Sequence, residues 1–314
     1  MRKLLIMKRR LFVSIASAAT VLPVAARGQT PIPIKIGIIP AEICGQIIYG
    51  VEGGFFSRAG LDVQTQTFTS GGAIAAALAG GAVDIGMVDL TSMINAHVHG
   101  IPFIGLAPAL VNSSASPTFG IVVRGDSEIR VAKDFEGKSI GVNGLNNIAQ
   151  VSAMAWIDNN GGNSKLVKFV ELPLPAKAAA IKAGTIDASL DTEPFLTYGL
   201  DQGFRAFFME VKPIASPYLL DFFASTRDWA QHNAPAAAKF IAATRETSIW
   251  ANANRPLTAP MLAKATRIPL EVVQRMRRGV FAVNNDPKLV QPVIDAVARY
   301  GIIAKAFPAT ELIN

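Results

Sequence analysis

The stretch Ile34–Ser92 constrains the fold of this chain most strongly. Three runs rich in β-forming residues, Ile34–Ile39, Leu61–Phe68 and Val83–Val88, alternate there with two helix-like segments. Strands that alternate with helices of this length favour a parallel sheet, whose connecting loops gather at the carboxyl ends of the strands. Ligands of open α/β sheets bind at that edge. The sequence therefore predicts an α/β fold with a ligand site where these strands end.

The same order of elements returns between residues 126 and 211. Strands are predicted over Ser139–Val142, Lys168–Leu172 and Ile186–Leu190, with helices between them. Polar residues again follow the first and third strands. The residues themselves do not repeat, so the sequence indicates a repeated architecture. After residue 227 the pattern predicts helices over 235–253, 258–266, 270–277 and 287–300, which we expect to pack on the outside of the first unit.

Residues 1–28 have the composition of a secretory leader. A basic start precedes the apolar run Leu11–Ala26, which is shorter than the ~20 residues of a membrane span. The segment Lys8–Val13 resembles a twin-arginine export motif, and an ordinary secretory leader is the alternative. Met7 is an alternative start, and cleavage is expected after Ala26 or Gly28. We therefore expect a mature protein in the periplasm.

The positive charge of the chain is concentrated in this leader. Six of the 30 Lys and Arg residues and none of the 23 acids lie in residues 1–28. The remainder therefore carries 24 basic against 23 acidic residues, a net charge of +1. This balance removes the main reason to expect a nucleic-acid partner.

Catalytic and metal-binding motifs are weak in this sequence. Cys44 is the single cysteine, so no internal disulfide can form, and a nucleophilic role at a helix start would need a nearby base. The chain has no HxxxH or CxxC spacing, no GxGxxG and no GxxxxGKS/T loop. Neither a metal nor a cofactor is expected.

The predicted strand ends carry groups for two kinds of ligand. Helix starts near Ile43, Gly72 and Asn147 direct backbone N–H groups to this edge, which suits an anion. Four acids stand at neighbouring loop ends: Glu42, Asp89, Asp191 and Glu193. These acids suit an amine, or they cap helices, which is the commoner role of such residues. The residues alone leave both interpretations open.

Several short motifs carry a resemblance to a known family. They are Gly37-x-x-Pro40, Glu52-x-Gly54-Phe55-Phe56-x-x-x-Gly60-Leu61-Asp62-Val63, Ser70-Gly71-Gly72, Gly81-x-Val83-Asp84-Ile85-Gly86, Gly137-Lys138-x-Ile140-Gly141-Val142 and Gly184-x-Ile186-Asp187-Ala188-x-x-x-x-Glu193-Pro194-Phe195. Together they resemble the solute-binding proteins of ABC transporters for nitrate, sulfonate, taurine and thiamine-pyrimidine precursors, over roughly residues 34–250.

The resemblance implies a type II periplasmic-binding-protein fold. This is a two-domain α/β fold, with two mostly parallel sheets flanked by helices and a ligand cleft at the hinge. Domain I is expected to comprise residues 29–118 and 220–314, and domain II residues 119–219. By position in the family motifs, the implied ligand contacts are Pro40, Glu42, Cys44, Ser70, Gly71, Gly72, Asp89, Thr91, Asn143, Asn146, Asn147 and Glu193.

The function implied is non-enzymatic capture of a small polar organic solute by closure of two domains, for an ABC importer. The expected partners are the solute, sulfonate-, taurine- or nitrate-like or a pyrimidine or amine, and a permease in the inner membrane. A monomer is expected, with no nucleic acid bound. One alternative is a thiamine-pyrimidine-forming enzyme of the same fold, although its fungal forms have a cysteine cluster and an active-site histidine that have no match here. A secreted ligand sensor for a membrane receptor is the other.

Overall fold

A computed structural model describes residues 30–209 and 214–313 of the chain. Residues 31–314 form one compact unit. The expected leader, with its twin-arginine segment and both cleavage positions, lies outside the described residues. Within the described part, no helix has the length and apolar character needed to cross a membrane.

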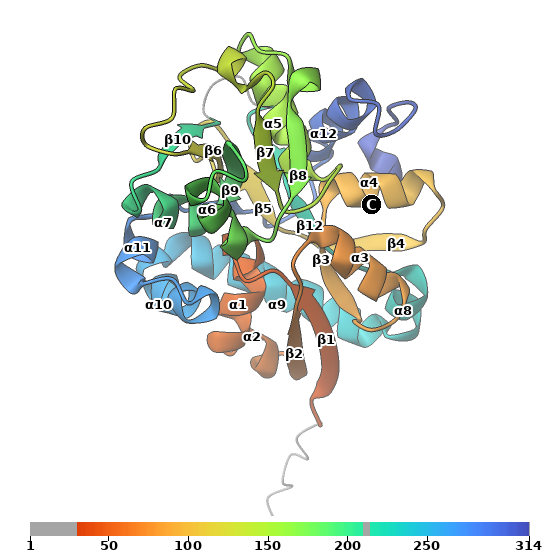
Figure 1. The fold of residues 1–314 in the computed structure, drawn as a ribbon. Coiled ribbons are helices and arrows are strands. Elements are labelled where there is room, and N and C mark those ends of the chain that lie inside the picture. Colours follow the sequence, from red (N-terminus) through yellow and green to blue (C-terminus); the bar gives the residue numbers. More distant parts are fainter. Residues whose placement is uncertain (1–29, 210–213, 314) are drawn as a thin grey trace, which may run out of the picture. The chain divides into compact units, whose positions relative to one another are not determined.

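The first sheet has five strands in the order β2-β1-β3-β12-β4 (Figure 1). Their bounds are β1 Ile32–Ile38, β2 Leu61–Thr67, β3 Ile85–Asp89, β4 Phe103–Pro108 and β12 Asp221–Thr226. β1 pairs in parallel with both β2 and β3, whereas β12 runs antiparallel to its neighbours β3 and β4. Four of the five strands therefore point the same way, and β12 is the reversed strand.

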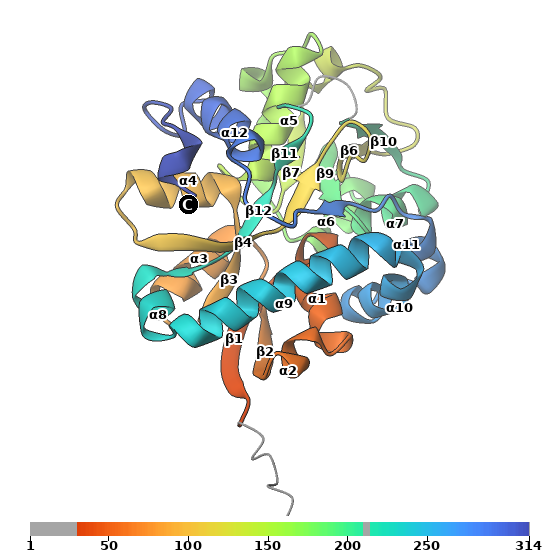
Figure 2. The ribbon, with the colours of Figure 1, turned by 180° about the vertical axis from the view of Figure 1, so that it is seen from behind.

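Helices cover both faces of this sheet. They are α1 Gly45–Glu52, preceded by the 3-10 turn Glu42–Cys44, α2 Phe55–Arg58, α3 Gly71–Ala79, α4 Leu90–Val98, α8 Arg227–His232, α9 Ala234–Ala253 and α10 Arg255–Thr266. α9 crosses behind the sheet together with α1 and α2, while α3 lies on the opposite face (Figures 1 and 2). The stacked rings of Phe56 and Phe240, 5.7 Å apart, join α2 to α9.

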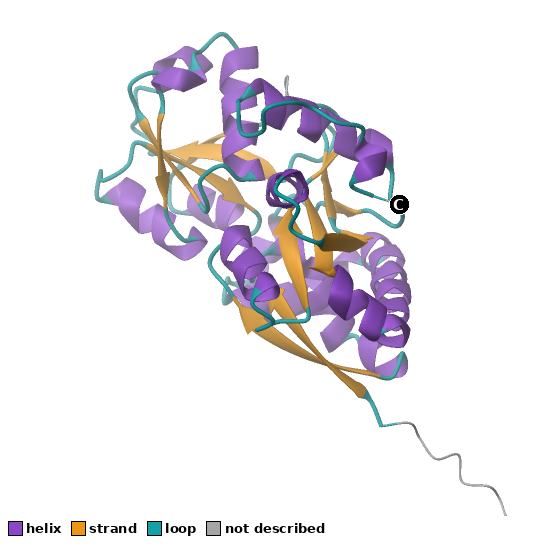
Figure 3. Cartoon of the chain, turned by 90° about the vertical axis from the view of Figure 1, so that its right-hand side faces the viewer, coloured by secondary structure: helices purple, strands orange, loops and turns teal. Residues whose placement is uncertain are grey.

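The second sheet repeats this plan in the order β10-β6-β9-β7-β8. Its strands are β6 Phe119–Val123, β7 Ser139–Val142, β8 Lys168–Glu171, β9 Ala188–Thr192 and β10 Arg205–Phe208. β7 pairs in parallel with β8 and β9, and β6 is the reversed strand between β9 and β10. Figure 3 shows the strands as two groups with helices around each.

The helices of the second sheet are α5 Ile148–Asn159, α6 Leu174–Lys182 and α7 Phe195–Asp201, with 3-10 turns Ala132–Phe135 and Ser164–Leu166. Adjacent residues of β10 show that both faces of the sheet are covered, because successive strand side chains point to opposite sides. The Phe207 ring packs 5.8 Å from Trp156 of α5, while Phe208 packs against the buried cluster of Val122, Ile181, Ile186 and Leu196.

The same pair of residues, a glycine followed three positions later by an aspartate, precedes β3 and β9. Gly81 and Gly184 end the preceding helices with φ of +72° and +70°, which glycine adopts at little cost. Three residues later, Asp84 accepts the N–H of Lys35 at 2.8 Å, and Asp187 accepts the N–H of Ser139 at 2.8 Å. Both strands therefore begin later than the predicted ranges 83–88 and 186–190, since these aspartates occupy the strand entrance.

The carboxyl-terminal segment differs in part from the prediction. Its further elements are α11 Leu270–Arg275, β13 Val280–Phe281, α12 Pro287–Arg299 and the 3-10 turn Ala309–Glu311. β13 joins β5 Leu110–Asn112 and β11 Tyr218–Leu219 in a small third sheet that sequence patterns did not predict. α9 and α10 pack on the first unit as expected, but α11 contacts α7 and α12 contacts both α4 and α5. This segment therefore bridges the two halves.

Candidate functional site

The loops at the carboxyl ends of the two sheets face each other. Residues that follow β1 and end β3 line the same cavity as residues that follow β7 and end β9. Two backbone groups bond directly across this boundary: Ile148 N donates to Asp89 Oδ1 at 3.1 Å, and Glu42 N donates to Glu193 O at 3.1 Å. The edge predicted to bind a ligand is therefore built from both halves of the chain.

The cavity between these loops has a volume of about 20 Å³, room for about one water molecule. Its walls are largely apolar and include Ile39, Ile43, Met87, Phe119, Leu174 and Leu190. Its polar side chains are Asp89, Asn143, Asn147, Asp191, Thr192 and Asp221. A small number of polar groups in an apolar wall is the usual composition of a small-molecule site.

Asp89 ends β3 and begins α4. Its carboxylate accepts the Ser92 N–H at 3.1 Å and the Ser92 hydroxyl at 2.5 Å, which caps the helix, and it also accepts the Ile148 N–H of α5. Burial raises the pKa of Asp89, and these donors oppose the shift. Gly71 leaves the space for this group, because a Cβ there would lie 2.8 Å from Asp89 Oδ2.

Asp221 stands directly opposite Asp89 in the β12–β3 pairing. It is 2% exposed, and its Oδ2 has no hydrogen-bond partner in the part of the chain that the structure describes. Burial raises the pKa of Asp221 well above its usual range, and the adjacent Asp89 raises it further. Like charges directly opposite each other on paired strands are destabilising.

Asp191 contributes a third carboxylate, from β9, but it has a counter-charge. Lys177 Nζ lies 3.4 Å from Asp191 Oδ1 and also donates to the Leu190 carbonyl. Ser189 Oγ donates to Asp191 Oδ2 at 2.8 Å. Burial raises the pKa of Asp191 and lowers the pKa of Lys177, while their mutual attraction opposes both shifts.

The amino-terminal end of α5, near Asn147, is one of the positions where the sequence predicted anion-binding N–H groups. Asn147 caps the helix by accepting the Gln150 N–H at 3.0 Å, and its Nδ2 donates to Asn143 Oδ1 at 3.1 Å. The next N–H, of Ile148, is bonded to Asp89. A carboxylate of the chain itself therefore occupies the positive end of this helix in the structure.

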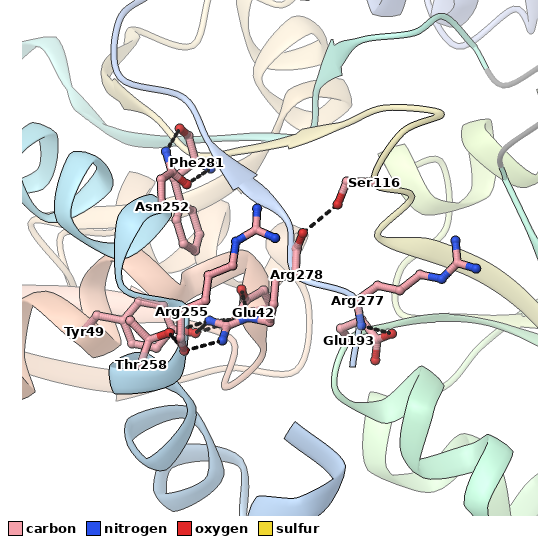
Figure 4. Close-up of polar contacts among 10 residues, drawn as sticks. All are labelled: Glu42, Tyr49, Ser116, Glu193, Asn252, Arg255, Thr258, Arg277, Arg278 and Phe281. Atoms are coloured by element: carbon pink, nitrogen blue, oxygen red, sulfur yellow. Dashed lines mark hydrogen bonds and ion pairs between the residues drawn. The ribbon is translucent and has the colours of Figure 1, made fainter. Parts of the chain in front are cut away.

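Glu42 lies beside the cavity, within a buried ion-pair network (Figure 4). Its carboxylate accepts the Tyr49 hydroxyl and Arg278 Nε at 2.9 Å, and Arg278 also donates to Thr258 Oγ1 at 2.6 Å and to the Arg255 carbonyl at 3.0 Å. Burial raises the pKa of Glu42, and Arg278 opposes this shift.

Glu193 is likewise bonded within the chain. It accepts the Thr197 N–H at 3.1 Å, the Thr197 hydroxyl at 2.9 Å and the Arg277 N–H at 3.3 Å. Burial raises the pKa of Glu193 to about 7, against the effect of these donors. Neither Glu42 nor Glu193 lines the cavity. Both carboxylates bond to the carboxyl-terminal segment, Glu42 to the Arg278 side chain and Glu193 to the Arg277 N–H (Figure 4).

Of the twelve residues predicted to bind a ligand, Gly71, Asp89, Asn143 and Asn147 line the cavity. Ser70 is buried behind them and caps α3 by accepting the Ala73 N–H at 3.2 Å. Pro40 is half-buried, and Gly72 and Asn146 are exposed. Thr91 lies in the first turn of α4, two residues after Asp89, and is buried. None of these five lines the cavity.

Cys44 is fully buried, and its Sγ accepts the Ile39 N–H at 3.3 Å. Burial raises the pKa of this thiol far above its usual range. A thiolate is the reactive form of cysteine, so this environment opposes a nucleophilic role. Among the described residues, no group of three or more His, Cys, Asp or Glu side chains is arranged to hold a metal ion.

Sequence reasoning missed Asp221 and Thr192 as cavity residues. Asp221 is the lone acid in the apolar run Tyr218–Ala224, and a single acid in a strand of that kind was an available signal. Thr192 follows Asp191 at the end of β9, and nothing in its local sequence separates it from an ordinary strand threonine.

A larger cavity, of about 750 Å³, lies at the opposite edge of the second sheet. It is lined by charged groups of both signs, among them Arg124, Asp126, Lys138 and Asp187. Several of these side chains are exposed, and this edge holds the amino ends of β7 and β9. The smaller cavity is the stronger candidate because it joins both sheets at their carboxyl ends.

Comparison with known proteins relates this geometry to a family. A family model described as NMT1/THI5 like matches residues 44–257. A binding protein of Brucella abortus (strain 2308) is 31% identical over 138 residues, which is 43% of this chain and 40% of that protein. A binding protein of Brucella melitensis biotype 1 matches to the same extent. The chain therefore spans less than half the length of the curated relatives it matches.

Solved structures share the fold across most of the chain. The alkanesulfonate-binding protein SsuA of Xanthomonas axonopodis pv. citri, bound to MOPS, has a TM-score of 0.75 at 18% identity, over 90% of this chain and 98% of that one. The periplasmic nitrate-binding protein NrtA of Synechocystis PCC 6803 has a TM-score of 0.72 at 16% identity, over 89% and 84%.

The desulfurization enzyme DSZB is a further structural neighbour, with a TM-score of 0.63 at 11% identity, over 90% of this chain and 96% of that one. At such identities the likeness concerns the fold alone. The predicted α/β fold of the periplasmic-binding-protein type is thereby confirmed.

Proposed function

We propose that this chain, which belongs to the NMT1/THI5-like family, is a solute-binding protein that captures a small polar organic molecule by closure of two α/β bodies. The bodies proposed are residues 29–118 with 220–314, and residues 119–219. Closure works when a ligand contacts both bodies, because it then stabilises the closed state relative to the open one.

The contact between Asp89 and Ile148 is the observation that carries this proposal. Asp89 belongs to the first sheet, and Ile148 begins α5 on the second sheet. Their hydrogen bond of 3.1 Å closes the cleft directly beside a cavity that both bodies line. A cavity of about 20 Å³ is too small for an organic solute, so the proposal requires the cleft to open in order to admit one.

We further propose that the protein acts in the periplasm, as a monomer, and delivers its solute to an ABC permease of the inner membrane. The leader-like composition of residues 1–28 supports export. The fold shared with proteins named as periplasmic sulfonate- and nitrate-binding proteins supports the same role. A secreted sensor would bind its ligand in the same way, so the permease is the part of this proposal that needs its own test.

The proposed function is tested with purified protein and a broad panel of sulfonates, carboxylates, amines, nitrate and pyrimidines. A bound solute adds RT ln(1 + [L]/Kd) to the free energy of unfolding, which is about 2.7 kcal/mol at 100 times Kd, and so raises the melting temperature. We expect at least one class to stabilise the protein and to be recovered unchanged. Chemical conversion of that solute would instead support the enzyme alternative, and no stabilisation by any class would refute solute binding.

The permease is tested with inner-membrane vesicles prepared from the cells that produce this protein. Uptake of the identified solute should require both the protein and ATP. Uptake that proceeds equally without the protein would contradict the proposed partner while leaving solute binding intact.

A further inference from the structure

The charges around the small cavity do not balance. Three carboxylates line it, those of Asp89, Asp191 and Asp221, and among the described residues no Lys, Arg or His does. Lys177 compensates Asp191 from behind, at 3.4 Å. The pair formed by Asp89 and Asp221 has no such counter-charge, so an excess of negative charge develops when both ionise, and burial together with Asp89 raises the pKa of Asp221.

This pair also has capacity for a donor. Asp221 Oδ2 is buried and finds no hydrogen-bond partner among the described residues. Thr192 lies on the other sheet and is 4% exposed, and its Oγ1 likewise has no hydrogen-bond partner among the described residues. Both residues line the cavity. Buried polar atoms are normally satisfied, so two such atoms on residues that line one small cavity indicate a missing hydrogen-bond partner.

The chemistry of the missing group follows from these two atoms. The ionised form of a carboxyl group only accepts hydrogen bonds, and an ammonium group offers three donors and a positive charge that favours this ionised form of Asp221. A sulfonate or nitrate would bring only acceptors and a further negative charge beside Asp89 and Asp221. An ammonium group would bond to Asp221 Oδ2 and Thr192 Oγ1 and offset the excess charge.

The rest of the cavity wall indicates the polarity of the remainder of the ligand. Ile39, Ile43 and Leu174 from the two bodies, together with the ring of Phe119, present apolar surface around the acidic pair. Such walls favour burial of carbon rather than of a second polar group.

We propose that the residues lining this cavity bind a small organic cation once the cleft has opened beyond its present volume of about 20 Å³, with the protonated amine between Asp221, Asp89 and Thr192 and the apolar body against the surrounding wall. This rests on the proposed function and names the solute class of that same site. It differs from the sulfonates and nitrate named for structural neighbours of the chain.

The proposal is tested with matched probes on the full mature chain at pH 7. Propylamine, ethanolamine and benzylamine are each compared with the neutral alcohol and the sulfonate of the same carbon skeleton, by thermal shift and calorimetry. We expect amines to bind at least about ten times more tightly than their partners, which corresponds to about 1.4 kcal/mol.

The variant Asp221→Asn assigns this binding to the cavity. It should weaken amine binding at least tenfold without lowering the melting temperature of the empty protein, because asparagine keeps the side-chain volume and removes an acid whose ionisation is already disfavoured by burial and by Asp89. Asp62→Asn, which removes the same charge from an exposed position of β2, should change neither property. Thr192→Val should weaken amine binding severalfold and provides the test if Asp221→Asn does not fold.

Different outcomes separate the two proposals. Tighter binding of a sulfonate or an alcohol than of its amine would overturn the cation assignment and leave solute binding standing. Amine binding that survives both Asp221→Asn and Thr192→Val would also overturn the assignment. If no compound of any class binds, solute binding itself fails, and the cation assignment fails with it.

Discussion

Arg278 provides the most quantitative test of how the site is supported. It lies in the segment before β13 and donates to Glu42, Tyr49 and Thr258, three residues of the first body (Figure 4). The side chains of Arg278 and Glu42 are 9% and 1% exposed. The substitution Arg278→Met keeps much of the side-chain volume and removes the charge.

The expected cost follows from what remains around Glu42. Its carboxyl would keep the Tyr49 hydroxyl and lose its counter-charge while still buried. Removing one partner of a buried ion pair costs about 3–5 kcal/mol of the free energy of unfolding. For a chain of this size, about 2 °C per kcal/mol is expected, so the melting temperature should fall by about 6–10 °C.

Two comparisons isolate the buried pair, using urea unfolding and thermal melts. Arg275→Met removes a guanidinium that pairs with Asp201 at the surface, 2.7 Å away, and should cost much less than Arg278→Met, because solvent screens an exposed ion pair. Adding Glu42→Gln to Arg278→Met should restore part of the lost stability, because the uncompensated carboxylate is then absent. The reasoning is refuted if Arg278→Met costs no more than Arg275→Met.

Three further substitutions test separate parts of the account. Since the pKa of Glu193 is raised to about 7, its ionisation should destabilise the folded protein progressively as pH rises from about 4.5 to 7. In urea unfolding, the free energy of unfolding of Glu193→Gln should therefore gain about 3 kcal/mol on that of the wild type across this window. A constant difference between the two would contradict this. Gly86→Ala places a Cβ 2.4 Å from Ile74 Cγ2 and should cost about 1–3 kcal/mol in thermal melts, whereas an unchanged melting temperature would show that α3 can shift freely. Ser70→Ala removes the α3 cap and should cost about 1 kcal/mol with ligand affinity unchanged; a loss of affinity measured by calorimetry would instead make Ser70 a ligand residue.

Local signals in the sequence predicted the strands and helices that build the site. The strand Ser139–Val142 was predicted with the bounds that the structure has, because it is a short apolar run between turn residues. The cap residues Asp89 and Asn147 were predicted at the correct edge, since polar residues that follow buried strands in an α/β unit must gather there.

Contacts between distant segments were not predictable in this way. Asp221 reaches the cavity only because β12 returns antiparallel beside β3, more than 130 residues later in the chain. The ion pair between Glu42 and Arg278 joins residues 236 positions apart, and Lys177 meets Asp191 through the packing of α6 on β9. Sequence reasoning therefore assigned Glu42 to the ligand, because its counter-charge lies in a segment without any recognisable motif.

Methyl NMR of isoleucine-labelled protein tests the central claim most directly. Ile39 and Ile43 line the cavity from the first body, and Ile148 lines it from the second. Titration with a stabilising solute should shift all three methyl signals at one common Kd, while Ile249, exposed on α9, stays unchanged. Shifts confined to Ile129, Ile181 and Ile186 of the cavity at the opposite edge of the second sheet would contradict capture between the two bodies.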